Sequence, residues 1–462
     1  MSEQATLNNK YVGYADYKDS RVEELGRLPA TWGVKKVNYL FSFGRGLNIT
    51  KANLEDTGIP VVNYGEVHSK YGFVVDPVIH PLKCVSSEYL KTNPGALLRR
   101  GDFVFADTSE DLEGAGNFTH FDGSCDLFAG YHTVVLRPQH DNLPRFLAYA
   151  FDSLECRSQV KLAVKGVKVF SVTQGILKDV ALPVPPIEEQ RTIAAFLDYE
   201  TARIDSLIDK QQRLIELLKE KRQAVISHAV TKGLNPDAPM KDSGVEWLGQ
   251  VPEHWVVAKL GYRYEVLLGK MLDAKRISGA HLGHYLRNTD VQWGKINTLG
   301  LPQMDFRPDE AARYSVNRGD LLVCEGGEIG RAAVWQHDEP CFYQKALHRL
   351  RPYNSKTDLT GYFFYILFDA ATQGRFDGGA GKATIAHLPA ETFRQYRFAF
   401  PPYEEQIELE EHLREITEKY DRIESQGLKQ ISLLQERRTA LISAAVTGKI
   451  DLRGWNQPEA KQ

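Results

Sequence analysis

The 462-residue sequence has few cysteines and no excess of charge of either sign. Its 5 cysteines are widely spaced and form no Cys-x-x-Cys pair, so we expect neither a disulfide framework nor a zinc site, and a reducing cytoplasm fits. Lys and Arg total 57 against 60 for Asp and Glu. This balance lacks the basic surplus typical of nucleic-acid binders. No run of about 18 apolar residues and no signal-peptide pattern occurs, so no membrane association is expected.

Motifs that carry catalysis are also missing. The best phosphate-loop candidate, Gly378–Thr384, has Phe376 where a P-loop requires its first glycine. The glycines of Gly326–Gly330 do not have the spacing of a dinucleotide-binding turn. His281 and His284 have no carboxylates spaced to share a metal ion with them, which favours ordinary surface histidines. We therefore expect no catalytic residue, no metal and no cofactor in this chain.

The sequence is instead written twice. Pro185–Gln190 reappears 216 residues later as Pro401–Gln406, and Lys221–Ser227 reappears at the same offset as Arg437–Ser443. A repeat without gaps over this length indicates a duplicated unit of fixed size. The period is far longer than the roughly 20–50 residues of solenoid repeats, so it represents a domain duplication.

A second repeat lies upstream, where Asp19–Gly26 matches Asp242–Gly249 at an offset of 223 residues. Between the two repeats only fragments correspond, and the offset drifts. Arg-Gly-Asp occurs at 100–102 and 318–320, and Leu-Arg-Pro occurs at 136–138 and 350–352. Each half therefore joins a constant segment to a variable globular segment that has gained and lost loop residues.

The constant segments are predicted to be long helices. Proline is accepted at a helix start, the following glutamates favour the helix dipole, and no Gly or Pro follows Pro186 before Gly233. Apolar residues recur at spacing near 3.5, which is typical of a coiled coil. About 40 helical residues would span roughly 60 Å. We expect the two helices to pack antiparallel as a rod between two globular units. The apolar stripes are Leu197, Ile204, Ile208, Ile215, Leu218, Val225 and Ala229, and Leu413, Tyr420, Ile431, Leu434, Leu441 and Ala445.

The variable segments are predicted to be mixed α/β domains. Short β-like runs broken by turn residues include 73–75, 102–105, 133–136 and 320–323. One helix is expected before each constant segment, at 143–153 and 359–368. The expected domains are 1–181, 182–235 (first long helix), 236–397 and 398–462 (second long helix).

The constant segments resemble those of the specificity subunit of type I restriction–modification systems, and the resemblance covers essentially the whole chain. The first copy reads Leu-Pro-Val-Pro-Pro-Ile-Glu-Glu-Gln over 182–190 and Leu-Leu-Lys-Glu-Lys-Arg-Gln-Ala-Val-Ile-Ser over 217–227. The second copy ends Ala-Ala-Val-Thr-Gly-Lys-Ile-Asp-Leu at 444–452. The pair of copies at a fixed offset is far more specific than one copy would be.

The resemblance implies a fold class of α+β: two mixed α/β target recognition domains related by pseudo-twofold symmetry, joined by two long antiparallel coiled-coil helices. Each domain would read one half of a split sequence in double-stranded DNA. The helices would set the unread spacer and dock two modification (methyltransferase) subunits, which carry S-adenosylmethionine and methylate adenine. Restriction (translocase and nuclease) subunits are a further candidate partner. The chain has no Asn-Pro-Pro-Tyr methyltransferase motif, which agrees with a non-catalytic recognition subunit.

Candidate contact residues follow from side-chain chemistry, because Lys and Arg bind phosphates or guanine and Asn and Gln can pair with adenine. Asn63 and Asn288 are expected at similar places in the two halves. Exposed positions on the long helices are expected to dock the partner subunits. The DNA candidates are Lys51, Asn63, Tyr64, Lys161, Lys165, Lys168, Asn288, Gln292, Arg331, Lys345 and Lys382. The docking candidates are Glu189, Gln190, Arg191, Arg222, Glu405 and Gln406.

Two other functions stay open at this point. A coiled-coil adaptor that joins two protein-binding domains would have the same architecture. A stand-alone enzyme such as a nuclease ranks last, because no set of metal-binding carboxylates is evident. Under the first hypothesis the balanced charge predicts weak DNA binding by the chain alone and tight binding only inside a complex.

Overall fold

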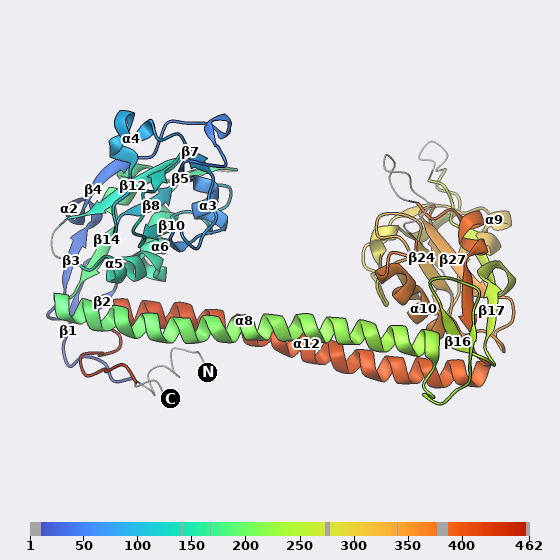
Figure 1. The fold of residues 1–462 in the computed structure, drawn as a ribbon. Helices are drawn as coiled ribbons and strands as arrows, with labels where there is room; N and C mark the ends of the chain where they lie inside the picture. The colour runs from blue at the N-terminus through green and yellow to red at the C-terminus, as the bar shows by residue number, and fades with distance from the viewer. Residues whose placement is uncertain are drawn as a thin grey trace. The chain divides into compact units, whose positions relative to one another are not determined.

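The computed structural model describes residues 11–139, 142–166, 168–272, 278–339, 341–376 and 387–458. The chain forms two compact units (Figure 1). Unit 1 contains Met1–Gln211 and Lys429–Gln462, and unit 2 contains Gln212–Leu428. Each unit therefore combines one mixed α/β domain with a part of both long helices. No helix of the described ranges is long and apolar enough to cross a membrane.

The domain of unit 1 is built on a five-stranded sheet in the order β4-β12-β8-β10-β6, in which only β6 runs parallel to its neighbour. Smaller ladders join β11-β5-β7, β13-β9, β14-β3 and β1-β2. The strands are β1 (Tyr17–Asp19), β2 (Arg27–Pro29), β3 (Gly33–Lys36), β4 (Phe41–Arg45), β5 (Ile59–Val62), β6 (Phe73–Val75), β7 (Cys84–Val85), β8 (Phe103–Ala106), β9 (Thr108–Ser109), β10 (Phe118–Phe121), β11 (Phe128–Ala129), β12 (Thr133–Pro138), β13 (Phe170–Ser171) and β14 (Ala181–Val184). The helices are α2 (Val37–Leu40), η1 (Lys51–Asn53), α3 (Tyr64–Ser69), α4 (Tyr89–Thr92), η2 (Pro94–Ala96), α5 (Pro144–Asp152), α6 (Leu154–Ala163) and α7 (Gln174–Asp179).

The central strand β8 is buried on both faces, and its side chains alternate between two cores. Phe103 and Phe105 point toward α5, where their rings lie 5.4 and 5.1 Å from the ring of Phe151. Val104 and Ala106 belong to a second core with Val67 of α3. Because helices cover both faces, β8 ends at a surface built by α3 and the neighbouring loops.

The domain of unit 2 repeats this plan with sheets in the orders β18-β27-β24-β25 and β22-β19-β26-β23. Short ladders join β17-β28, β15-β16 and β20-β21. The strands are β15 (Met240–Asp242), β16 (Gln250–Pro252), β17 (Val256–Lys259), β18 (Tyr264–Leu268), β19 (Leu282–Leu286), β20 (Val291–Gln292), β21 (Lys295–Ile296), β22 (Gln303–Asp305), β23 (Ser315–Val316), β24 (Leu321–Cys324), β25 (Ala332–Val334), β26 (Cys341–Tyr343), β27 (Leu347–Pro352) and β28 (Arg397–Phe400). The helices are η3 (Leu260–Tyr262), η5 (Asn288–Asp290), α9 (Pro308–Tyr314), α10 (Thr360–Thr372) and α11 (Ala390–Gln395).

The short motifs that echo between the halves are partners of each other. Asp102 of the first Arg-Gly-Asp accepts a hydrogen bond from Arg137 of Leu-Arg-Pro at 3.1 Å. In unit 2, Asp320 accepts two bonds of 2.7 Å from Arg351. Both carboxylates are buried, and a buried carboxylate requires such a cation. The pair joins the turn before the central strand to the neighbouring strand β12 or β27.

The long helices are α8 (Ile187–Lys232) and α12 (Tyr403–Val446), and they pack antiparallel in each unit (Figure 1). In unit 1, Leu197 of α8 shares a core with Leu441 near the end of α12. In unit 2 the order reverses, and Ala229 of α8 shares a core with Leu413 near the start of α12. Every residue of the two predicted stripes is buried or half-buried. The prediction of paired amphipathic helices is confirmed.

The repeated Pro-Pro-x-Glu-Glu-Gln motif holds each domain to its helix. Gln190 accepts a hydrogen bond from the Leu143 amide at 3.0 Å, just before α5 begins, and donates to the Pro185 carbonyl at 2.9 Å. Gln406 makes the same two bonds with Leu359 and Pro401, both at 2.9 Å. Each amide therefore fixes the start of a domain helix to the start of a long helix.

The glutamate before each glutamine binds a buried tryptophan. Glu189 accepts from Trp32 Nε1 at 3.0 Å and from the Tyr14 hydroxyl at 2.7 Å. Burial and this carboxylate together raise the pKa of Tyr14 far above its usual value. Glu405 accepts from Trp255 Nε1 at 3.1 Å. The tryptophans lie in the first repeated segment, so the two upstream and downstream repeats meet through these bonds.

This geometry corrects the predicted docking residues. Gln190 and Gln406 are only 2% and 1% exposed, so the prediction that they are exposed is wrong. Their amides are fully used inside the units, together with Glu189 and Glu405. Arg191 is exposed and pairs with Glu188, and Arg222 is half-buried and pairs with Asp421.

Candidate nucleic-acid interface

The central strand of each unit ends at a surface made of loops, which we name the loop face. In unit 1 it comprises residues 63–69, 107–117, 130–132 and 164–172. Asp107 follows β8 directly: its amide donates to the His132 carbonyl at 3.1 Å, and its carbonyl accepts from the Val172 amide at 2.8 Å. These main-chain bonds bring segments far apart in the sequence to one end of the sheet.

The loop face of unit 2 is built by the same bonds and comprises residues 287–292, 325–331, 344–346 and 387–388. The Glu325 amide donates to the Ala346 carbonyl at 3.0 Å, and the Glu325 carbonyl accepts from the Leu388 amide at 2.9 Å. Ala346 and His132 of unit 1 both have positive φ, 92° and 56°, immediately before β27 and β12. Side chains rarely adopt this conformation, so the two faces share the same strained turn.

Four predicted DNA residues of the first half lie on the loop face or at its edge. Tyr64 begins α3, with its ring 5.7 Å from the ring of His132. Lys165 and Lys168 are exposed in the segment that leads into β13. Lys161 at the end of α6 forms an ion pair of 2.5 Å with Glu113 of the 107–117 loop. Lys51 is exposed in η1, outside the loop face as defined.

Asn63 is a correction, because its side chain is 1% exposed and cannot reach a base from this position. It precedes α3, where its side chain and that of Glu66 form a capping box. The residue at the same place in unit 2 is Arg287, which precedes η5 and pairs with Asp290. The predicted match of Asn63 with Asn288 is therefore wrong by one residue, and Asn288 corresponds to Tyr64.

In unit 2 the structure brings Asn288, Gln292, Arg331 and Lys345 to the loop face. Arg331 donates to the Asn288 carbonyl at 2.9 Å. The Gln292 amide is exposed and donates to Thr289, and Lys345 is exposed in the turn before β27. Lys382 lies outside the described residues, as does most of the Gly378–Thr384 candidate.

The loop faces hold acidic and basic groups in pairs. Arg331 lies 3.2 Å from Glu328, and Lys161 lies 2.5 Å from Glu113. Arg287 binds Asp290 at 2.7 Å. Burial alone would raise the pKa of Asp290, but hydrogen bonds from the Arg287 side chain and amide outweigh it, so the pKa is lowered. Cations already neutralised by neighbours explain how a chain without net positive charge can present several basic side chains.

Four further residues of the loop faces were not predicted: His68, Asn117, His132 and Trp293. Asn117 donates to the His68 carbonyl at 3.1 Å, and Trp293 donates to Glu328 at 2.5 Å. A usable signal existed, since the Arg-Gly-Asp motif places the central strand and therefore the loop after it. Among the residues with described positions, no group of three or more His, Cys, Asp or Glu side chains could hold a metal ion.

Comparison with known proteins gives the two domains a family. The model of the type I restriction modification DNA specificity domain matches residues 29–217 and 284–433. The putative type I restriction enzyme MjaX specificity subunit of Methanocaldococcus jannaschii is 23% identical over 446 residues, which cover 95% of this chain and 98% of the relative. The type I restriction enzyme EcoKI specificity subunit of Escherichia coli K12 is 23% identical over 445 residues, covering 92% of this chain and 90% of the relative.

A solved structure has the same fold. It was described under the words "complex assembly and conformational transition of the type I R-M system", and the match has a TM-score of 0.70 at 17% identity. It covers 92% of this chain and 99% of the solved chain. Since the family model matches well over half of the sequence, once in each half, the chain belongs to the family of type I restriction–modification DNA specificity subunits and has two recognition domains.

Proposed function

We propose that the chain recognises a bipartite target in double-stranded DNA, with one half read by the loop face of each unit. The observation that carries this proposal is that two loop faces with the same main-chain bonds carry different side chains. Tyr64 in unit 1 corresponds to Asn288 in unit 2, and His132 corresponds to Ala346. A constant frame with varied polar side chains suits two readers of different sequences.

In this proposal α8 and α12 act as the spacer between the half-sites. α8 has 46 residues and α12 has 44, and each contributes to both units. Neither helix can change length without changing both units. The number of unread base pairs would then be a property of the helices and not of the recognition domains.

The exposed helix surfaces are the proposed docking sites for two modification subunits. Unit 1 exposes Leu207 and Leu433, and unit 2 exposes Leu214, Leu217 and Leu428. Apolar side chains left in water along a helix are typical of a surface that a partner covers. The partners would supply S-adenosylmethionine and the adenine methylation chemistry, and this chain would act without a catalytic centre of its own. Restriction subunits would join the same complex.

The test is to express the chain with its modification subunits in a host free of adenine methylation and to sequence the methylated adenines. A split motif is expected. Exchange of residues 236–397 for those of another family member should change one half of the motif only. A continuous motif, or a change in both halves, would contradict the proposal.

The spacer is tested by inserting seven residues into each helix, after Gln211 in α8 and after Leu428 in α12, where the two units meet in the sequence. The unread spacer should lengthen while both half-sites keep their bases. Insertion of the same seven residues after Gly300, in an exposed loop of unit 2, is the control and should leave the spacer unchanged.

A further inference from the structure

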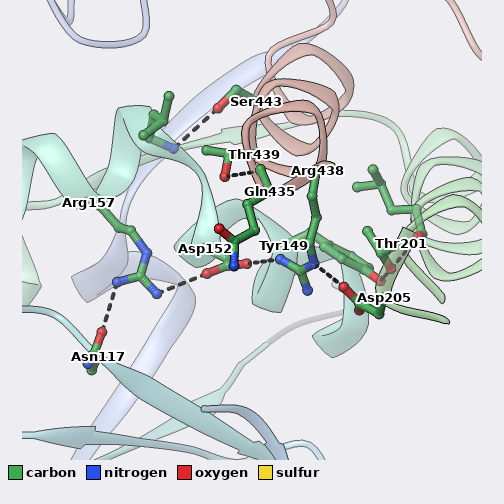
Figure 2. Close-up of polar contacts among 12 residues, drawn as sticks. Asn117, Tyr149, Asp152, Arg157, Thr201, Asp205, Gln435, Arg438, Thr439 and Ser443 are labelled. Atoms are coloured by element: carbon green, nitrogen blue, oxygen red, sulfur yellow. Dashed lines mark hydrogen bonds and ion pairs between the residues drawn. The ribbon is translucent and has the colours of Figure 1, made fainter. Parts of the chain in front are cut away.

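Arg438 connects the helix pair of unit 1 with its recognition domain (Figure 2). This arginine of α12 lies 3.1 Å from Asp205 of α8 and 3.3 Å from Asp152 at the end of α5. The side chain of Asp152 is 15% exposed, so its ion pairs are less screened by water and salt than those of a surface carboxylate. Arg438 therefore bridges both long helices and the domain.

The contacts continue from Asp152 to the loop face. The other oxygen of Asp152 accepts from Arg157 of α6 at 2.9 Å, and Arg157 donates to Asn117 Oδ1 at 2.9 Å. Asn117 closes the 107–117 loop and donates to His68 of α3, the helix that begins with Tyr64. A row of charged and amide groups thus leads from the helix pair to two segments of the loop face.

Unit 2 has a matching row made largely of aromatic rings. Arg222 of α8 pairs with Asp421 of α12 at 2.9 Å, and its guanidinium lies 5.7 Å from the ring centre of Phe368. The Phe368 ring lies 5.0 Å from that of Trp293, in edge contact. Trp293 donates to Glu328 at 2.5 Å, and Glu328 pairs with Arg331 on the loop face.

The outer part of the two rows is constant and the inner part is not. Arg222 and Arg438 stand 216 residues apart in the constant segments, and so do their aspartates, Asp205 and Asp421. The residue that each arginine meets inside the domain differs at this same offset: Asp152 in unit 1 and Phe368 in unit 2. The same helical arginine is therefore used by two recognition domains in chemically different ways.

We propose that Arg438 and Arg222 are positioning residues for DNA recognition, each fixing the loop face of its own unit. This inference rests on the proposed function. Arg438 acts through an ionic row and Arg222 through an aromatic one. Neither arginine contacts DNA. Each comes from the half of the sequence that contributes the other recognition domain, so each half of the chain orients the loop face of the other.

The test uses the full chain assembled with its modification subunits and reads adenine methylation across a genome. Arg438→Met should lower discrimination at first-half bases about tenfold, the cost of one mismatch, and leave the second half unchanged. Arg222→Met should do the reverse, so each variant is the control for the other. A loss shared equally by both halves, or by neither, would overturn the inference.

Rescue separates positioning from a general loss of folding. Arg438→Lys keeps the charge but not the planar fork, and should restore part of the first-half discrimination. If Arg438→Met does not accumulate as a folded chain, Asp152→Asn breaks the same row at unchanged size and should relax the first half alone. A wild-type complex without a split motif would overturn the proposed function itself, whereas a split motif unaffected by these variants would overturn only the positioning role.

Discussion

The two units hold their frames by the same contacts and their loop faces by different ones. Buried tryptophan, glutamate and glutamine meet identically at Glu189 and Glu405, and one Asp–Arg pair joins the same two strands in both units. Near the loop faces the partners change from carboxylate and guanidinium to aromatic rings. The difference shows which parts of the fold tolerate variation: contacts between the two repeated segments are fixed, and contacts that reach the loops are free to change.

The largest expected effect tests whether the tryptophan contacts are equivalent. Trp32→Ala and Trp255→Ala should each reduce the stability of their own unit by about 3–5 kcal/mol, because each empties a fully buried site and leaves a glutamate without its donor. Hydrogen exchange over residues 14–36 and 240–259 measures the two losses separately. If one substitution were mild, the two domains would not be held alike.

Acid sensitivity should distinguish the sheets. Burial lowers the pKa of His120 on β10 to about 4, while the strand pairing places Val334 at the same position in unit 2. The unfolded chain gains a proton near pH 6.5 and the folded chain only near pH 4. The free energy of unfolding should therefore fall as the pH drops through this window, by about 3 kcal/mol.

His120→Val should remove that loss in unit 1. Urea unfolding at pH 7 and pH 4.5, followed by hydrogen exchange in β8 and β10, compares the variant with the native chain. Equal pH dependence in both would mean that His120 takes up its proton in the folded state at an ordinary pH.

The Asp–Arg pairs offer a finer comparison. Arg351→Met should destabilise unit 2 by about 2 kcal/mol, because it leaves the Asp320 carboxylate buried without either of its two bonds. Arg137→Met should cost less, since Asp102 loses a single longer bond and keeps the Arg99 amide. Denaturant midpoints of the two variants give the order, and a reversed order would show that the Arg137 bonds to Gly95 and Leu97 matter more.

The smallest effect concerns phosphate contacts. Removing Lys165 or Lys345 from the assembled complex should lower the slope of log affinity against log salt by about 0.9 each and should not change the motif. Lys51→Ala, outside the loop face, should leave the slope as it is. A change at Lys51 would extend the interface to η1.

The frame could be predicted well because its signals are local. The β-like runs at 73–75, 102–105, 133–136 and 320–323 correspond to β6, β8, β12 and β24, and the helices predicted at 143–153 and 359–368 correspond to α5 and α10. The glutamines of the repeated motif were misjudged, because their burial depends on a domain helix some 47 residues away in sequence. The loop faces needed the fold itself, since main-chain bonds between distant segments decide which side chains meet there.

The glutamine contacts have a consequence for how such chains evolve. Gln190 and Gln406 bind six groups between them, and five of these are main-chain atoms; only Asn142 offers a side chain. Main-chain amides and carbonyls are the same in every protein. A recombined gene that brings in an unrelated domain would need to retain only the buried tryptophan and the start of one helix for the joint to form. New specificities could then arise by exchange of whole segments in a single genetic event, without compensating changes in the helices.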